Sequence, residues 1–192
     1  MQTRQTLIER LRDKYDEKSW QTFIDSYQRY IYVVIRGMAI KHEEAEDLVQ
    51  EVLLQLWTKL PNFRYDPDKA MFRTWLCKVI KNRVLNFIKA QESQSKRIDK
   101  ASQQVFKEYT NHEMDQLMQK EWEVYITNLA LERIRNSFPG QSIKVFELTL
   151  EGKSIADIAE TLGLKENSVY KSKNRVKAKL INEISNLRYE LE

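Results

Sequence analysis

The sequence EEAEDLVQEVLLQLW, residues 43–57, decides the fold class of this chain. Its apolar side chains recur every three or four residues, which is the rhythm of one face of an amphipathic α-helix. The stripe continues to Leu60 over about four turns, and Pro61 then predicts the end of the helix. The stripe consists of Ala45, Leu48, Val49, Val52, Leu53, Leu56, Trp57 and Leu60.

The same periodicity appears on both sides of this helix. A helix is expected before it, with Ser19 as N-cap and an apolar face from Trp20 to Met38. Another is expected after it, with inward residues from Phe72 to Ile88. Four Gly and three Pro among 192 residues are too few for the turns of a sheet-rich chain. We therefore expect an all-α fold.

A polar segment separates two helical parts. The sequence QESQSKRIDKASQQ, residues 91–104, has no apolar periodicity and is typical of a linker. Helical patterns resume after it, with a break at Pro139-Gly140. The prediction is two small helical domains, residues 1–90 and 113–192, joined by a linker over residues 91–112.

The second domain contains a helix-turn-helix pattern, SIADIAETLGLKENSVYKSKNRVKAKL, residues 154–180. Ala159 is small enough for two helices to cross closely, and Gly163 can adopt the positive φ of a tight turn. The second helix should begin near Glu166 and carry amides and cations suited to a DNA major groove. An ordinary helical hairpin with a basic surface is the alternative. The candidate DNA contacts are Asn167, Ser168, Tyr170, Lys171, Lys173, Asn174, Arg175 and Lys177.

Charge is unevenly distributed along the chain, although the net charge is only +4. Residues 43–51 hold five acids and no cation, whereas residues 64–89 hold seven cations against two acids. Residues 165–179 hold six cations against one acid. Two basic stripes and one acidic face indicate two kinds of partner, with solvated helix faces as the alternative.

Several function classes are disfavoured by the sequence. Cys77 is the single cysteine, so no internal disulfide can form and a reducing cytoplasm fits. His42 and His112 are isolated, and no Gly-rich phosphate loop or convincing acid/base pair is visible. No apolar run approaches the roughly 20 residues of a membrane span. We expect a cytoplasmic protein without membrane insertion, metal, cofactor or enzymatic activity.

The motif AEDLVQEV followed by FRTWL resembles the extracytoplasmic-function (group 4) sigma factors of the sigma-70 family. The resemblance covers nearly the whole chain in the family's order of region two, linker and region four. It implies a dissociable subunit that directs bacterial core RNA polymerase to promoters. Residues 1–90 would dock the polymerase and melt the minus-ten element, and residues 113–192 would bind the minus-thirty-five element through a helix-turn-helix of the winged-helix-like or sigma region 4 type.

The acidic helix leaves a second face beside its apolar stripe. The resemblance implies that this face docks basic helices of the polymerase β′ subunit, and that the β subunit is also a partner. An acidic face suits such a reversible interface with basic helices. A solvated face is again the alternative. The predicted docking residues are Glu44, Asp47, Gln50, Glu51 and Leu54.

Rings and cations alternate in NFRYDPDKAMFRTWLCKVIKNR, residues 62–83. Rings can stack on unpaired bases while cations follow the phosphates. The resemblance implies that this loop and helix hold the melted promoter strand, although Ala70 and Met71 depart from the family's pattern before the matching Phe. Phe72, Trp75 and Phe87 are expected in the core instead. The predicted strand contacts are Arg64, Tyr65, Lys69, Arg73, Lys78, Lys81, Asn82 and Asn86.

Two other functions remain open at this stage. A stand-alone helix-turn-helix regulator would bind a palindromic duplex as a homodimer without polymerase. A nuclease would need clustered metal-binding carboxylates, for which Asp66 and Asp68 are the candidates. The resemblance also implies that an anti-sigma factor can hold the protein inactive, but no residue here shows such a partner.

Overall fold

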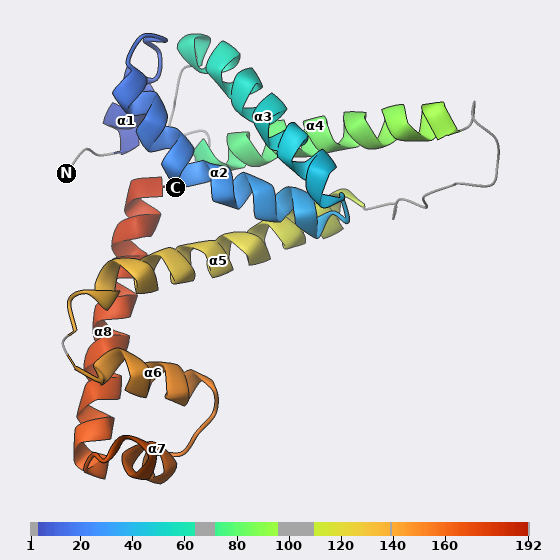
Figure 1. Ribbon diagram of the computed structural model, residues 1–192. Helices are drawn as coiled ribbons and strands as arrows, with labels where there is room; N and C mark the ends of the chain where they lie inside the picture. Colours follow the sequence, from blue (N-terminus) through green and yellow to red (C-terminus); the bar gives the residue numbers. More distant parts are fainter. Residues whose placement is uncertain (1–3, 64–71, 96–109, 139, 192) are drawn as a thin grey trace. The chain divides into compact units, whose positions relative to one another are not determined.

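The computed structural model describes residues 4–63, 72–95, 110–138 and 140–191. These residues are almost entirely helical and contain no β-strand, which confirms the predicted all-α fold (Figure 1). The elements are α1 (Arg4–Arg10), α2 (Glu17–Gly37), α3 (His42–Lys59), the 3-10 helix η1 (Leu60–Asn62), α4 (Phe72–Ser95), α5 (Asn111–Arg135), α6 (Ser142–Leu150), α7 (Ile155–Leu162) and α8 (Glu166–Leu191).

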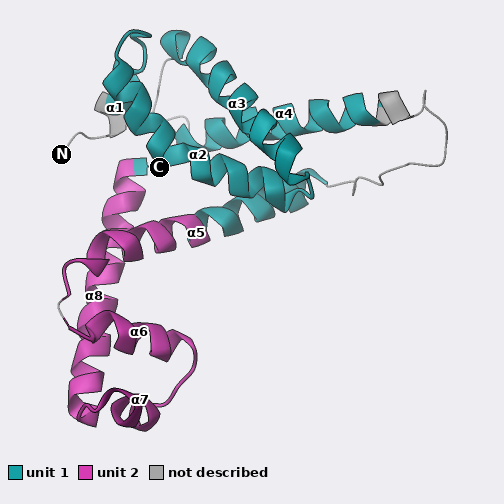
Figure 2. Ribbon diagram, in the orientation of Figure 1, with its two compact units in different colours: residues 1–123, 191–192 teal, residues 124–190 magenta. Residues whose placement is uncertain are grey.

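The chain divides into two compact units, which Figure 2 shows in different colours. Unit 1 comprises residues 1–123 and 191–192, and unit 2 comprises residues 124–190. The division falls inside α5. Helix α4 continues to Ser95, into the segment whose polarity had indicated a linker. Polar side chains do not prevent a helix from extending, and Gln91 there donates a hydrogen bond to Glu44 of α3 (3.2 Å).

Aromatic side chains fix the start of α4 in the core of unit 1. Phe23 and Tyr27 of α2 lie with ring centroids 4.7 Å apart. Phe72, the first residue of α4, meets the Phe23 ring at 5.9 Å and the Tyr27 ring at 5.6 Å, both edge-on. Phe72 is fully buried, as predicted. This cluster anchors the helix that carries all of the candidate strand contacts among the described residues.

Helix α2 begins at a different cap from the predicted one. Asp16 is the N-cap, and its carboxylate accepts hydrogen bonds from the Ser19 backbone N–H (3.1 Å) and hydroxyl (2.9 Å). The backbone bond from Ser19 is the main cause of a lowered Asp16 pKa, with Arg10 contributing. The prediction of Ser19 as N-cap was wrong. Asp and Ser both cap helices, and Asp16, three residues earlier, is the one that accepts the hydrogen bond from the first turn of α2.

In unit 2 the turn between α7 and α8 matches the predicted helix-turn-helix. Ser154 caps α7 in a capping box with Asp157, through bonds of 3.1 and 3.3 Å. Gly163 follows α7 with φ 63°, and the next N–H, from Leu164, bonds to the Ala159 carbonyl (2.9 Å). A left-handed residue at this place ends the helix and turns the chain towards α8.

The core of unit 2 lies between α6, α7 and the start of α8. Ala159 sits among the buried residues, where its small side chain allows close packing, as predicted. Leu150 is apolar but exposed at the end of α6. Arg133 of α5 pairs with Glu183 (3.2 Å) and Glu190 (2.9 Å) of α8. The buried cluster comprises Val145, Leu148, Ile158, Ala159 and Val169.

Candidate functional site

The outward face of α3 carries three of the five predicted docking residues. Asp47, Gln50 and Leu54 are exposed, and Leu54 reaches 62% exposure although it is apolar. Trp57, one turn further, is 41% exposed, with the Lys14 ammonium 4.7 Å from its ring centre. Its prediction as part of the buried stripe was wrong, since the end of α3 leaves its ring only partly covered. The face therefore combines a carboxylate, an amide and two partly exposed apolar groups.

Two acids of this helix bind α4 instead of pointing freely outward. Glu51 forms an ion pair with Arg83, and the half-buried Glu44 accepts the hydrogen bond from Gln91. These contacts brace α3 against α4. Sequence reasoning missed the role of Arg83, because a pair between two helices leaves no spacing signal along one helix.

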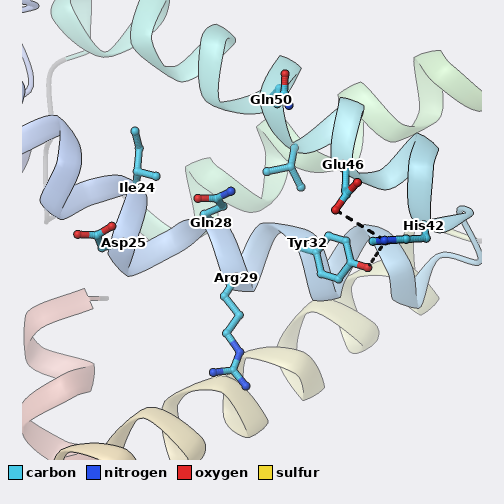
Figure 3. A pocket seen from close by; sticks show the side chains of 9 residues that line it. Ile24, Asp25, Gln28, Arg29, Tyr32, His42, Glu46 and Gln50 are labelled. Carbon is cyan, nitrogen blue, oxygen red and sulfur yellow. Dashed lines mark hydrogen bonds and ion pairs between the residues drawn. The ribbon is translucent and has the colours of Figure 1, made fainter.

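A groove lies beside this face, between α2 and α3 (Figure 3). At one side of it, the Tyr32 hydroxyl and His42 Nδ1 are hydrogen-bonded at 2.9 Å, and His42 Nε2 lies 3.7 Å from Glu46. Gln50 belongs both to the groove and to the outward face of α3, so the two are continuous. The lining residues are Ile24, Asp25, Gln28, Arg29, Tyr32, His42, Glu46, Val49 and Gln50.

On α4 the predicted strand contacts fall into two groups. Lys78, Asn82 and Asn86 are exposed and recur every four residues, so they form one stripe along the helix. Arg73 and Lys81 are half-buried and hydrogen-bonded to groups on α5. The remaining predictions on this segment lie outside the described residues; they are Arg64, Tyr65 and Lys69 on the loop, with Asp66, Asp68, Ala70 and Met71.

The rings next to this loop pack against each other. Trp75 and Phe63 are half-buried, with centroids 4.3 Å apart and planes tilted by 32°. Trp75 also meets the buried Phe72 ring at 5.6 Å. Phe87, expected in the core, is half-buried. Trp75 and Phe63 thus contribute to the packing at the start of α4, where the predicted strand-binding surface begins.

Cys77 lies on the inner side of α4, where it is hydrogen-bonded to the Tyr30 hydroxyl at 3.3 Å. Burial raises the pKa of the Cys77 thiol, and burial also raises the pKa of Tyr30 above its usual value. The Tyr30 hydroxyl donates its proton to the Met118 carbonyl at 3.2 Å and accepts from the Cys77 thiol. A neutral, hydrogen-bonded thiol is a structural group rather than a nucleophile.

The first turns of α8 present a polar stripe to solvent. Asn167, Tyr170, Lys171 and Asn174 are exposed at spacings of three and four residues, opposite the buried Val169 and Val176. Such a stripe can place an amide, a ring and a cation against base edges in a major groove. Ser168 and Lys177 are exposed on its flanks.

Two other predicted contacts on α8 lie differently. Lys173 is half-buried. Arg175 donates a hydrogen bond to the Ser142 hydroxyl (3.0 Å), and its guanidinium lies 5.4 Å from the centre of the Phe138 ring. Arg175 therefore braces α8 against the start of α6. It is exposed and lies beside the polar stripe of α8.

Neither a metal centre nor a membrane span is found in the described parts of the chain. They contain no group of three His, Cys, Asp or Glu side chains that could hold a metal ion. None of their helices is long and apolar enough to cross a membrane.

Comparisons with known proteins bear on both units. The family model Sigma-70 region 2 matches residues 23–94, and the model Sigma-70, region 4 matches residues 139–180. Together the two matches cover more than half of the chain. No curated protein sequence matches it. One similar solved structure is described as CnrH in complex with the cytosolic domain of CnrY; it is 20% identical, covers 95% of this chain and 97% of that one, and has a TM-score of 0.37.

Proposed function

This chain belongs to the sigma-70 family of transcription initiation factors, and on that premise we propose that it acts as an extracytoplasmic-function sigma factor for bacterial core RNA polymerase. As a sigma factor it binds DNA and is not itself an enzyme. RNA synthesis is carried out by the polymerase. The subgroup assignment is supported by the motif AEDLVQEV followed by FRTWL and by the order of the two regions along the chain.

The observation that carries the proposal is the presence of regions 2 and 4 on one chain, each with its own candidate surface. Region 2 includes α3 and α4, which expose an acidic face and a stripe of one cation and two amides. Region 4 spans the helix-turn-helix and its exposed polar stripe on α8. A stand-alone regulator would use the second surface only.

We assign polymerase docking to the outward face of α3. Asp47 and Gln50 are exposed there beside the apolar Leu54, so a basic helix pair can gain charge complementarity and one apolar contact. Glu51 and Glu44 act mainly by holding α3 on α4, since both are bound to that helix. The β′ subunit is the proposed partner for this face.

We assign capture of the melted promoter strand to α4 and the loop before it. The stripe of Lys78, Asn82 and Asn86 offers one ammonium and two amides along the path of a single strand. Lys81 and Arg73 flank that stripe. Arg64, Tyr65 and Lys69 complete the proposal on grounds of sequence alone.

We assign the upstream duplex contact to α8. The stripe from Asn167 to Asn174 would enter the major groove, and Lys177 would contact phosphate. Two weak DNA contacts held on one enzyme gain selectivity through effective concentration, without any new interaction. The proposed partners, polymerase and chromosome, place the protein in the cytoplasm. An anti-sigma factor is a further partner that membership of this subgroup would imply.

The test is co-elution of the purified protein with sigma-free bacterial core RNA polymerase in gel filtration. We expect a stoichiometric complex that an excess of another sigma factor displaces, because both would dock the same site. A folded protein that elutes alone contradicts the proposal and favours a stand-alone regulator. In that case the free protein should bind a palindromic duplex tightly as a homodimer.

A further inference from the structure

The first half of α5, residues 111–123, contacts a cation of the proposed strand-binding surface within unit 1. Lys81 Nζ lies 3.1 Å from Asp115 Oδ1 and donates to the Asn111 carbonyl at 3.3 Å. Only 16% of the Lys81 side chain is exposed, compared with 66% of the Asp115 side chain. The Lys81 ammonium is thus held by oxygen acceptors of its own chain.

The same segment binds a second cation, Arg73, near the start of α4. Arg73 Nη2 donates to Gln119 Oε1 at 2.9 Å, and its guanidinium lies 5.4 Å from the centre of the Trp122 ring. An open groove of about 620 Å³ remains between α4 and this part of α5. Lys78 and Asn82 line it from α4, opposite Asp115 and Gln119.

Apolar packing holds the segment in place. Met114, Met118 and Trp122 are all buried, and the Tyr30 ring meets the Trp122 ring edge-on at 4.9 Å. Leu117 approaches the backbone of α2 so closely that a Cβ on Gly37 would lie 3.0 Å from its Cδ1. The contact is therefore a packed helix interface, and the polar bonds at Lys81 and Arg73 lie along it.

The acceptors on α5 resemble those of a nucleic-acid strand in their chemistry. A carboxylate and a carbonyl oxygen bind Lys81, as phosphate oxygens would bind an ammonium. Residues 113–123 carry four acids, Glu113, Asp115, Glu121 and Glu123, against the single cation Lys120. An acidic helix on a basic surface competes with a polyanion for the same cations.

We propose that residues 111–123 act as an intramolecular competitor of DNA, so that they must leave α4 before a melted strand can bind there. This inference rests on the proposed strand-binding role of α4. In the free protein it makes single-stranded DNA binding weak, because apparent affinity falls with the fraction of molecules whose α4 is uncovered.

The first readout follows the contact itself and needs no DNA. Limited acetylation of the full chain, followed by mass spectrometry, compares Lys81 with the exposed Lys78 on the same helix. We expect Lys81 to react about tenfold more slowly in the natural protein, and Asp115→Lys to remove most of that protection. Glu121→Lys is the matched control: it changes charge equally but lies about 120° around α5 from position 115, so Lys81 should stay protected.

The second readout is the affinity for a fluorescein-labelled single-stranded DNA of mixed sequence, measured by anisotropy without polymerase. We expect Asp115→Lys to bind about tenfold more tightly than the natural protein, and Glu121→Lys to bind much more weakly than Asp115→Lys. Adding Lys81→Ala to Asp115→Lys should remove most of the gain.

The two readouts separate the possible failures. If Lys81 reacts as fast as Lys78 in the natural protein, α5 does not cover it and the inference is wrong, while the proposed function stands. If Asp115→Lys uncovers Lys81 but binds DNA no better than Glu121→Lys, α4 is not the strand-binding surface. That second result overturns the competition together with the assignment on which it rests.

Discussion

Arg83 of α4 and Glu51 of α3 form an ion pair that joins the helix assigned to DNA with the helix assigned to polymerase. Both side chains are partly exposed, at 37% and 45%. The pair commits one of the five predicted docking residues to a structural contact. It also means that the two candidate surfaces of unit 1 belong to one braced pair of helices.

The first prediction concerns Asp47. Asp47→Arg should abolish binding to core polymerase, because it reverses the charge of the exposed docking face. Glu46→Arg is the matched control, since it makes the same charge change one residue away and about 100° around the helix. Gel filtration with core polymerase gives the result, and circular dichroism checks the fold. Equal loss in both variants, or binding unchanged by Asp47→Arg, would remove Asp47 from the interface.

The second prediction concerns the ion pair between Arg83 and Glu51. Partly exposed pairs contribute about 0.2–1 kcal/mol, so Arg83→Ala should lower the free energy of unfolding by about that amount. A double-mutant cycle with Glu51→Gln, measured by urea denaturation, isolates the pair. A coupling energy of zero would show that the pair does not brace the helices.

The third prediction concerns the turn of the helix-turn-helix. Gly163→Ala should destabilise unit 2 by about 1–2 kcal/mol, because a left-handed backbone is unfavourable for a residue with a Cβ. No neighbouring atom lies within 4 Å of the added Cβ among the described residues, so the cost is conformational. Gly163→Asn should cost less, since Asn tolerates this region better. Equal thermal unfolding of all three proteins would contradict the observed φ.

The fourth prediction separates two cations of α8. Lys171→Ala and Arg175→Ala should each weaken duplex binding and reduce its salt slope by about one. Only Arg175→Ala should also lower the unfolding temperature, because Arg175 is bonded to Ser142 and lies over Phe138. Fluorescence anisotropy across a salt series and a thermal melt give both quantities. An unchanged salt slope would exclude phosphate contacts at that position.

The fifth prediction concerns the reactivity of Cys77. Burial raises the pKa of the Cys77 thiol. The reactive thiolate therefore forms at a higher pH than the thiolate of an ordinary cysteine does. A disulfide reagent should therefore modify the folded protein slowly near neutral pH, with a rate that keeps rising at alkaline pH. Urea-unfolded protein is the control and should react quickly. Equal rates for the folded and unfolded protein would contradict the half-buried position of Cys77.

Much of the fold follows from the sequence because apolar periodicity identifies the buried face of each helix. The turn at Gly163, the start of α8 near Glu166 and the buried stripe of α3 apart from Trp57 were predicted correctly. Ser19 was mistaken for a cap because Asp16 has the same capping chemistry three residues earlier. Composition also misplaced the end of α4, since polar residues can continue a helix to Ser95.

The candidate site was less accessible to sequence reasoning, because periodicity shows that a face is buried but not what covers it. Met114, Met118 and Trp122 clearly form an apolar stripe, yet nothing in their spacing points to α2 and α4 as neighbours. The contacts of Lys81 with Asp115 and of Arg175 with Ser142 join residues more than 30 positions apart. The sequence therefore predicts Lys81 and Arg175 as free surface cations. The structure shows instead that both are hydrogen-bonded within the chain.

The most direct test of sigma-factor function is transcription of fragmented genomic DNA from the source organism by core polymerase, with and without this protein. Sequencing the RNA 5′ ends shows where synthesis begins. We expect the protein to create a set of new start sites that share upstream sequence elements at a fixed spacing, and Asp47→Arg to lose them. Start sites identical to those of core polymerase alone, despite a folded protein bound to the enzyme, would contradict the central claim.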